Sequence, residues 1–195
     1  MNSPSLWLAS RSPRRAELLR TLGVAFAVLD LEVDEAVVPG EAPAAYVARL
    51  AQAKAAAGRA SMPSPAPVLA ADTTVVIDAE ILGKPRDRAD GLRMLAQLAG
   101  RAHTVLTGVS LALPRGAQHG VTVTTTVFMR PLKPSEIEAY WASGEPVDKA
   151  GGYAVQGLGG AFVTRLEGSY SNVVGLPLAE TLGLLDAAGV RHALS

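Results

Sequence analysis

Short apolar runs alternate with longer helical patterns from the start of the chain, and this alternation constrains the fold more than any other feature. Apolar runs at 6–9 and 26–29 predict strands. A helical pattern follows each of them, at 12–22 and at about 44–60. Strands that alternate with helices in this way are typical of α/β proteins.

The second half of the chain favours antiparallel strands. The further strands that we expect are a pair at 68–77 and near Ile81, a hairpin of 104–113 with 121–128, and a strand at 161–166. The further helices are expected at about 89–98, 135–143 and 177–188. Two low-order stretches, 62–67 and 113–120, are too short to be domain linkers. The sequence therefore predicts one domain over residues 1–195, an α/β fold with a mixed twisted sheet flanked by helices, in two lobes.

The composition limits the possible partners. The 195 residues carry 18 Lys and Arg against 18 Asp and Glu, so no global field attracts nucleic acid or an anionic membrane surface. The absence of cysteine leaves any metal to oxygen ligands or to the three histidines. The first 15 residues do not read as a secretory signal, and no apolar run approaches the ~20 residues that span a bilayer. We therefore expect a cytoplasmic protein that binds neither membrane nor nucleic acid.

A strand that runs directly into a helix, LASRSPRR at 8–15, is the first candidate site. Ser12 suits the N-cap and a proline follows it, yet Arg14 and Arg15 add positive charge where the helix dipole is already positive. A bound anion would reverse the sign of this effect, and the hydroxyl groups of Ser10 and Ser12 would assist the helix amides in binding it. The sequence predicts either a phosphate site or a capped surface helix with two solvated arginines.

A carboxylate interrupts the apolar strand AADTTVV at 70–76. Burial of an unpartnered carboxylate is costly, so Asp72 must cap a turn, form an ion pair or bind a metal ion. Lys54 lies at the edge of a helical face and Lys84 in a loop, where solvent exposure would explain both. They are, however, two of only four lysines beside 14 arginines, which favours a role for a compact ammonium charge against a phosphate.

The glycine-rich segment GEPVDKAGGYAVQGLGG at 144–160 is the third candidate site. It matches neither the P-loop, in which Ser or Thr follows Gly-Lys, nor a dinucleotide fingerprint that opens a helix. Lys149 and Gln156 would suit contacts with the edge of a nucleotide base. A tight loop between strands is the alternative interpretation.

In this order and spacing the motifs resemble the Maf family, the septum-formation-inhibitor-like nucleoside triphosphate pyrophosphatases. The resemblance covers nearly the whole chain and is carried by LASRSPRR at 8–15, YVARLAQAKA at 46–55, ADTTVV at 71–76, LGKP at 82–85, GEPVDKAGGYAVQGLGGAFV at 144–163 and GSYSNVVGLPL at 168–178. It implies a Maf/ITPase-like fold with two lobes around a nucleotide-binding cleft, and it is compatible with a homodimer.

The resemblance also implies the chemistry, which is cleavage of a nucleoside triphosphate between the α and β phosphates with a divalent metal ion, Mg²⁺ or Mn²⁺. Asp72 is then the general base or a metal-anchoring carboxylate. Glu35 is either a second metal-facing carboxylate or a solvated loop acid. The residues that resemble the family's phosphate contacts are Ser10, Arg14, Arg15, Lys54 and Lys84.

Three positions resemble the branch of the family that acts on dTTP and UTP rather than the 7-methyl-GTP branch: Arg14, Thr73 and Gln156. The amide of Gln156 can both donate to and accept from a pyrimidine edge, which would disfavour cytosine. A nucleotide-responsive regulator of septation with slow turnover is the alternative function. A single-strand nucleic-acid binder is disfavoured, since aromatic residues make up only 5% of the chain and its net charge is zero.

Overall fold

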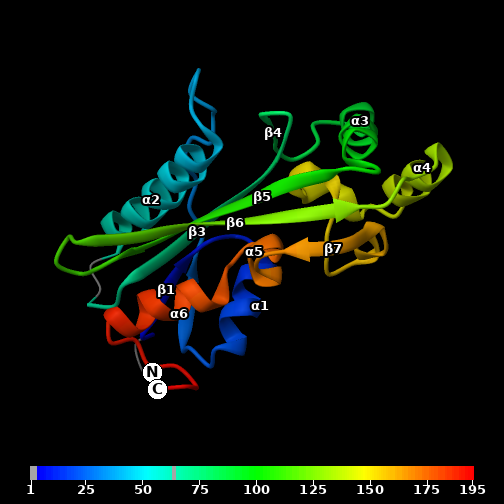
Figure 1. The fold of residues 1–195 in the computed structure, drawn as a ribbon. Coiled ribbons are helices and arrows are strands. Elements are labelled where there is room, and N and C mark those ends of the chain that lie inside the picture. Colours follow the sequence, from blue (N-terminus) through cyan, green and yellow to red (C-terminus); the bar gives the residue numbers. More distant parts are fainter. Residues whose placement is uncertain (1–3, 63–64) are drawn as a thin grey trace. The chain divides into compact units, whose positions relative to one another are not determined.

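The computed structural model describes residues 4–62 and 65–195 (Figure 1). In chain order its elements are β1 (Leu6–Ala9), α1 (Pro13–Thr21), β2 (Phe26–Leu29), α2 (Pro43–Ser61), β3 (Val68–Ile77), β4 (Glu80–Leu82), α3 (Arg88–Leu98), β5 (Ala102–Ala112), β6 (Gln118–Met129), α4 (Pro134–Ala142), the 3-10 helices η1 (Glu145–Asp148), η2 (Ala150–Gly152) and η3 (Leu158–Phe162), β7 (Val163–Glu167), α5 (Tyr170–Val174) and α6 (Leu178–Ala187). The described strands form a seven-stranded sheet in the order β2-β1-β3-β5-β6-β7, with β4 paired to β3. β1 lies parallel to β2 and β3, whereas the β3–β4 and β6–β7 pairs are antiparallel. The expected α/β fold with a mixed sheet and flanking helices is confirmed.

The structure divides into two compact units. Unit 1 takes in the described residues up to Asp72 together with Thr107–Val123 and Gly175–Ser195. Unit 2 takes in Thr73–Leu106 and Thr124–Val174. The long strands β3, β5 and β6 each have residues in both units. The candidate residues before Thr73 therefore belong to unit 1, and the glycine-rich segment belongs to unit 2.

In unit 1, successive residues of β3 belong to different layers of the core. Leu69 lies in a buried cluster with Leu19 of α1 and Leu185 of α6. Its neighbour Val68 lies in another buried cluster with Ala55 of α2. Because successive strand residues point to opposite faces, α2 covers one face of this part of the sheet while α1 and α6 cover the other, as Figure 1 shows.

The core of unit 2 lies against α3 and α4. Leu95 of α3 and Tyr140 of α4 belong to one buried cluster with Val75 of β3 and with Phe162. The rings of Tyr140 and Phe162 meet edge to face with their centroids 4.9 Å apart. This contact holds the end of α4 against η3.

The strand expected at 161–166 begins later than the sequence suggests. Ala161 and Phe162 belong to η3, so β7 starts at Val163. Apolar residues such as these occur both in 3-10 helices and in strands, so the apolar pattern alone does not distinguish the two. The turn expected at 113–120 is also shorter, because β6 already begins at Gln118. Part of the other low-order stretch, residues 63–64, lies outside the described residues.

The apolar surface of the longest helix, α2, faces the interior of unit 1. Its buried residues are Val47, Leu50, Ala51, Ala55 and Gly58. The positions between them carry alanines and the longer polar side chains of Arg49, Gln52 and Lys54, so the large apolar side chains lie on one face. Within the described part of the chain, no helix is both long enough and apolar enough to cross a membrane.

Candidate functional site

The turn between β1 and α1 forms a compact hydrogen-bonded unit around Arg15. Ser12 is the N-cap of α1, and its Oγ accepts from the backbone N–H of Arg15 at 3.4 Å. The Oγ of Ser10 accepts from the N–H of Ser12 at 3.2 Å and from Nη1 of Arg15 at 3.4 Å. Nε of Arg15 donates to the carbonyl oxygen of Gly175 at 2.8 Å. Arg15 is therefore a fixed guanidinium at the positive end of a helix, rather than a solvated surface arginine.

Several charged groups surround Arg15 within unit 1. Burial lowers the pKa of Arg15, the carboxylate of Asp72 opposes this, the neighbouring Arg14 lowers it further and Glu35 again opposes it. A guanidinium keeps its charge at neutral pH. Arg15 therefore contributes a positive charge to the electrostatic field at the start of α1. The first turn of α1 carries no acidic residue that would neutralise the two arginines. The segment at 10–15 and Asp72 thus belong to one electrostatic cluster.

Lys54 of α2 joins the two carboxylates of this cluster. Its Nζ lies 2.6 Å from Oδ1 of Asp72 and 2.6 Å from Oε1 of Glu35. The side chains of Lys54 and Asp72 are 13% and 11% exposed, whereas that of Glu35 is 52% exposed. The structure shows Asp72 in an ion pair, which is one of the three possibilities for this carboxylate, and the interpretation of Lys54 as a solvated lysine is wrong.

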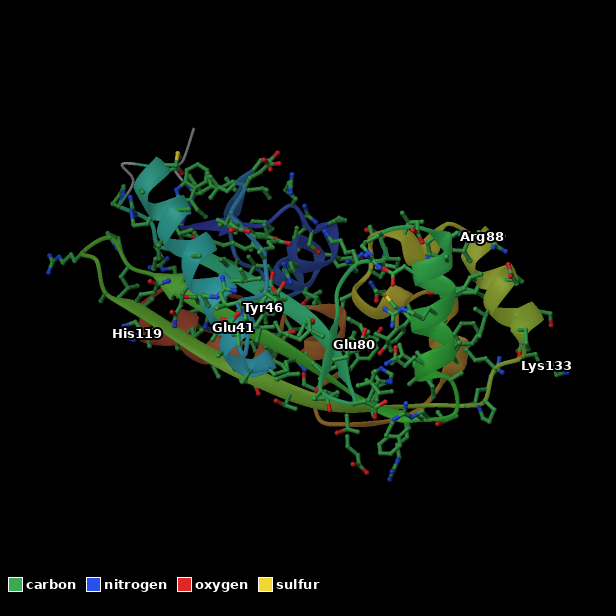
Figure 2. The ribbon with its side chains drawn as sticks, turned by 90° about the horizontal axis from the view of Figure 1, so that it is seen from above. Glu41, Tyr46, Glu80, Arg88, His119 and Lys133 are labelled. Carbon is green, nitrogen blue, oxygen red and sulfur yellow. The ribbon has the colours of Figure 1, made fainter. Side chains whose placement is uncertain are left out.

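The segment that carries Glu35 is held against the N-terminal end of α2. The hydroxyl group of Tyr46 donates to the backbone carbonyl of Glu35 at 3.0 Å, and Arg49 binds Glu41 through Nε at 2.6 Å. Figure 2 shows Glu41 and Tyr46 close together at this end of the helix. Burial and the charges of Asp72 and Glu35 raise the pKa of Tyr46 to about 12. Tyr46 therefore remains a protonated donor at neutral pH and keeps Glu35 in place.

The two carboxylates of this cluster suit a divalent metal ion whose remaining ligands come from a bound phosphate compound. Within residues 4–62 and 65–195, no three His, Asp or Glu side chains gather into a metal site. The carboxylates of Asp72 and Glu35 nevertheless converge on one position, which the ammonium of Lys54 fills. Mg²⁺ is commonly held by one or two carboxylates together with substrate phosphates. Asp72 and Glu35 suit this type of site.

The remaining candidate residues lie in unit 2. Thr73 directly follows Asp72 on β3 and is half-buried, whereas Lys84 and Gln156 are exposed. The backbone N–H of Gly151 donates to the carbonyl of Gly83 at 3.0 Å, so the loop of Lys84 lies beside the glycine-rich segment. The structure thus gathers the first six candidates in unit 1 and brings the Lys84 loop to the glycine-rich segment in unit 2.

Two residues that the sequence analysis did not single out hold this segment: Tyr140 and Glu145. The carboxylate of Glu145 accepts from the backbone N–H of Leu158 and of Gly159. A glutamate beside a proline in a loop carries no local signal for such a role. Lys149, which the sequence analysis noted, forms an ion pair with the adjacent Asp148.

Comparison with known proteins identifies the family of this α/β protein. The family model described as Maf-like protein matches residues 5–188, and the chain belongs to this family. It is 55% identical to a dTTP/UTP pyrophosphatase of Vibrio cholerae, over 95% of this chain and 98% of that protein. It is 56% identical to a dTTP/UTP pyrophosphatase of an Anaeromyxobacter species, over 94% of this chain and 89% of that protein.

The solved structures offer a more distant likeness. A nucleoside-triphosphatase, a dITP/XTP pyrophosphatase from Mycobacterium abscessus, is 20% identical to this chain, with a TM-score of 0.42. The match covers 65% of this chain and 75% of that one. Family membership accordingly stands on the sequence comparisons alone.

Proposed function

We propose that this protein hydrolyses dTTP and UTP to the monophosphate and pyrophosphate. One observation carries the proposal: unit 1 gathers Arg14, Arg15 and Lys54 with the carboxylates of Asp72 and Glu35. Cations suit a triphosphate, and paired carboxylates suit the metal ion that accompanies it. The relatives named dTTP/UTP pyrophosphatase, at 51–56% identity, support the choice of pyrimidine substrates.

Phosphoryl transfer depends on positioning and charge neutralisation more than on covalent chemistry. In the proposed reaction Asp72 accepts a proton from water as the water oxygen bonds to the α-phosphorus. The bond from that phosphorus to the bridging oxygen breaks, and pyrophosphate departs with the electron pair. The side chains that bind the phosphates and offset their growing charge are Ser10, Arg14, Arg15 and Lys84.

Lys54 has two roles in this scheme. Its ammonium holds Asp72 and Glu35 together, at 2.6 Å from each carboxylate. Asp72 and Glu35 would hold the Mg²⁺ or Mn²⁺ ion that accompanies the triphosphate, and the ammonium of Lys54 would contact a phosphate oxygen. The bound ion supplies charge neutralisation at the phosphates.

Base selection is assigned to Gln156, together with Thr73 and Arg14. The exposed amide of Gln156 can donate to a uracil or thymine carbonyl and accept from N3–H. Cytosine presents a different pattern of donors and acceptors on the same edge, so it should be the poorer substrate.

The test is a panel of nucleoside triphosphates incubated with purified protein, with Mg²⁺ and with a chelator. We expect pyrophosphate and monophosphate in equal amounts from dTTP and UTP, far less from CTP, and none with the chelator. Binding of UTP without catalytic release of pyrophosphate would favour the regulator of septation instead.

The proposal extends to the setting in which the protein works. We place it in the cytoplasm, where its triphosphate substrates are, as a homodimer without a nucleic-acid partner. Sedimentation equilibrium tests the dimer. Titration of a labelled single-stranded oligonucleotide at low and high salt tests the absence of a nucleic-acid partner, because binding to nucleic-acid phosphates weakens as the salt concentration rises.

A further inference from the structure

In the glycine-rich segment of unit 2, an exposed tip lies between buried residues. Gln156 and Leu158 are exposed, and Leu158 is 57% exposed despite its apolar side chain. The residues on either side, Ala154 and Gly159, are buried. A loop of small residues has many accessible conformations, so a defined tip requires specific restraints.

One restraint is the turn hydrogen bond from the backbone N–H of Gly157 to the carbonyl of Ala154 at 3.2 Å, and the others come from one pair of side chains. The carboxylate of Glu145 accepts from the backbone N–H of Leu158 at 2.9 Å and of Gly159 at 3.0 Å. It also accepts from the hydroxyl group of Tyr140 at 2.6 Å, and this hydroxyl oxygen accepts from the N–H of Ala154 at 3.1 Å. The backbone is thus fastened two residues before Gln156 and again two and three residues after it.

Two glycines of the segment are explained by this arrangement. A Cβ atom at Gly157 would lie 2.2 Å from Oε2 of Glu145, and one at Gly159 would lie 2.5 Å from the hydroxyl oxygen of Tyr140. Contacts this short are not tolerated between real atoms. The glycines at these positions let the backbone approach the two side chains.

We propose that Glu145 and Tyr140 are positioning residues that fix Gln156 for selection of the pyrimidine base. The inference rests on the proposed function and adds residues that act through Gln156. An amide side chain presents a donor and an acceptor and discriminates between bases only when its orientation is defined. Fixing the backbone on both sides of Gln156 limits the orientations that its amide can take.

The ionised state of Glu145 is what allows three donors to converge on it. Burial raises its pKa, but the hydroxyl group of Tyr140, the two backbone amides and the charge of Lys149 outweigh this and lower the pKa overall. A glutamine at this position keeps the shape yet has one acceptor oxygen, and its NH₂ group would face a backbone donor. Glu145→Gln therefore loosens the tip without removing bulk.

The experiment is a double-mutant cycle in the full chain. The ratio of kcat/KM for UTP to that for CTP is measured for the unsubstituted protein, Glu145→Gln, Gln156→Ala and the double variant. We expect Glu145→Gln to lower the ratio about three- to tenfold, the effect of a lost hydrogen bond, and to lower it no further when Gln156 is already alanine. Tyr140→Phe, which keeps the ring in the core, should act in the same direction. Glu167→Gln, on an exposed strand, should leave the ratio unchanged.

Two results would overturn the inference. One is an unchanged ratio in both Glu145→Gln and Tyr140→Phe. The other is that Glu145→Gln lowers the ratio equally whether residue 156 is glutamine or alanine. Glu145 would then act independently of the Gln156 side chain. Failure of the proposed function has a different signature, since the unsubstituted protein would then release no pyrophosphate from UTP. Hydrogen exchange at the amides of Leu158 and Gly159 needs no substrate and should be faster in Glu145→Gln.

Discussion

The charged cluster of unit 1 and the glycine-rich loop of unit 2 restrain their polar groups in different ways. In unit 1, one ammonium, that of Lys54, bridges two carboxylates, and the two arginines of α1 add further positive charge. In unit 2, the carboxylate of Glu145 is occupied by donors of its own fold. Under the proposed function, the first set of contacts exchanges partners when a charged ligand arrives, whereas the second set cannot do so without loosening the loop.

This contrast predicts where substitutions act. Changes in the unit 1 cluster should alter the chemical step and leave the free energy of unfolding nearly unchanged. Changes in the polar networks of unit 2 should alter loop position or stability and leave the chemical step intact. The following substitutions sharpen or break this comparison.

Asp72→Asn should have the largest effect. The amide keeps the shape of the side chain but cannot accept a proton from water or hold a metal ion, so turnover should fall by ~10²–10⁴-fold. Lys54 retains Glu35 as a partner, so the melting temperature should change little. Kinetics with UTP, UTP binding and thermal unfolding on the same sample test this. Turnover close to that of the unsubstituted protein would remove Asp72 from the mechanism.

Lys54→Met should come next. Loss of a cation at the phosphates should reduce turnover on the order of 10²-fold. It also leaves Asp72 and Glu35 side by side without their shared ammonium, so Mn²⁺ should bind without nucleotide at least about tenfold more tightly. Mn²⁺ titration followed by electron paramagnetic resonance measures this directly. Lys133→Met, at an exposed position in unit 2 (Figure 2), is the control.

Unchanged Mn²⁺ affinity in Lys54→Met would mean that the ammonium and the metal ion do not share a position. The cluster would then resemble the unit 2 loop, with contacts that no ligand rearranges. The contrast between the two regions would be lost on that outcome.

The sequence predicts the local parts of this architecture well. β1 and β2 have the expected bounds, and Ser12 caps α1 as expected, because strand periodicity and capping are encoded within a few residues. The five-residue helix α5 was not expected, since a segment that short has little periodicity of its own.

The contacts that define the two regions are harder to foresee. The partners Lys54 and Asp72 are 18 residues apart, on a helix and a strand whose packing decides whether they meet. Glu145 meets Gly159, 14 residues further along the chain, across a stretch of loops and short 3-10 helices. The glycines at 157 and 159 are the one local signal for this loop, and they indicate close approach without naming the side chain that approaches.

Gln156 variants should have an intermediate effect, confined to base selection. Gln156→Glu removes the amide donor and adds a negative charge. It should therefore lower kcat/KM for dTTP and UTP, by raising the free energy of activation by about 1–3 kcal/mol. Gln156→Ala should lower both and relax the preference over CTP. If both variants keep the UTP to CTP ratio of the unsubstituted protein, Gln156 is only a structural residue of the loop.

Asp90 gives the smallest effect and tests the stability side of the comparison. It lies on α3 in unit 2, is buried, and accepts from Nε of Arg86 at 3.1 Å and from Nη2 of Arg93 at 3.0 Å. The hydrogen bond from Arg86 is the main cause that lowers the pKa of Asp90 to about 2, against the opposing effect of burial. An unfolded aspartate titrates near ~3.9, so the folded state holds the carboxylate more strongly ionised.

Asp90 therefore stabilises the fold above about pH 4 and loses this contribution as the pH falls towards 2. Asp90→Asn should lower the free energy of unfolding by about 1 kcal/mol at pH 7, since both partner arginines are largely solvated. The difference should shrink between pH 4 and pH 2 in urea unfolding, while turnover of UTP at pH 7 is unchanged. Asp30→Asn, at a side chain that is 76% exposed, is the control substitution. A loss of turnover in Asp90→Asn with unaltered stability would contradict the roles assigned to the two units. The hydrogen-bond network of Asp90 would then contribute to the reaction rather than to the stability of the fold.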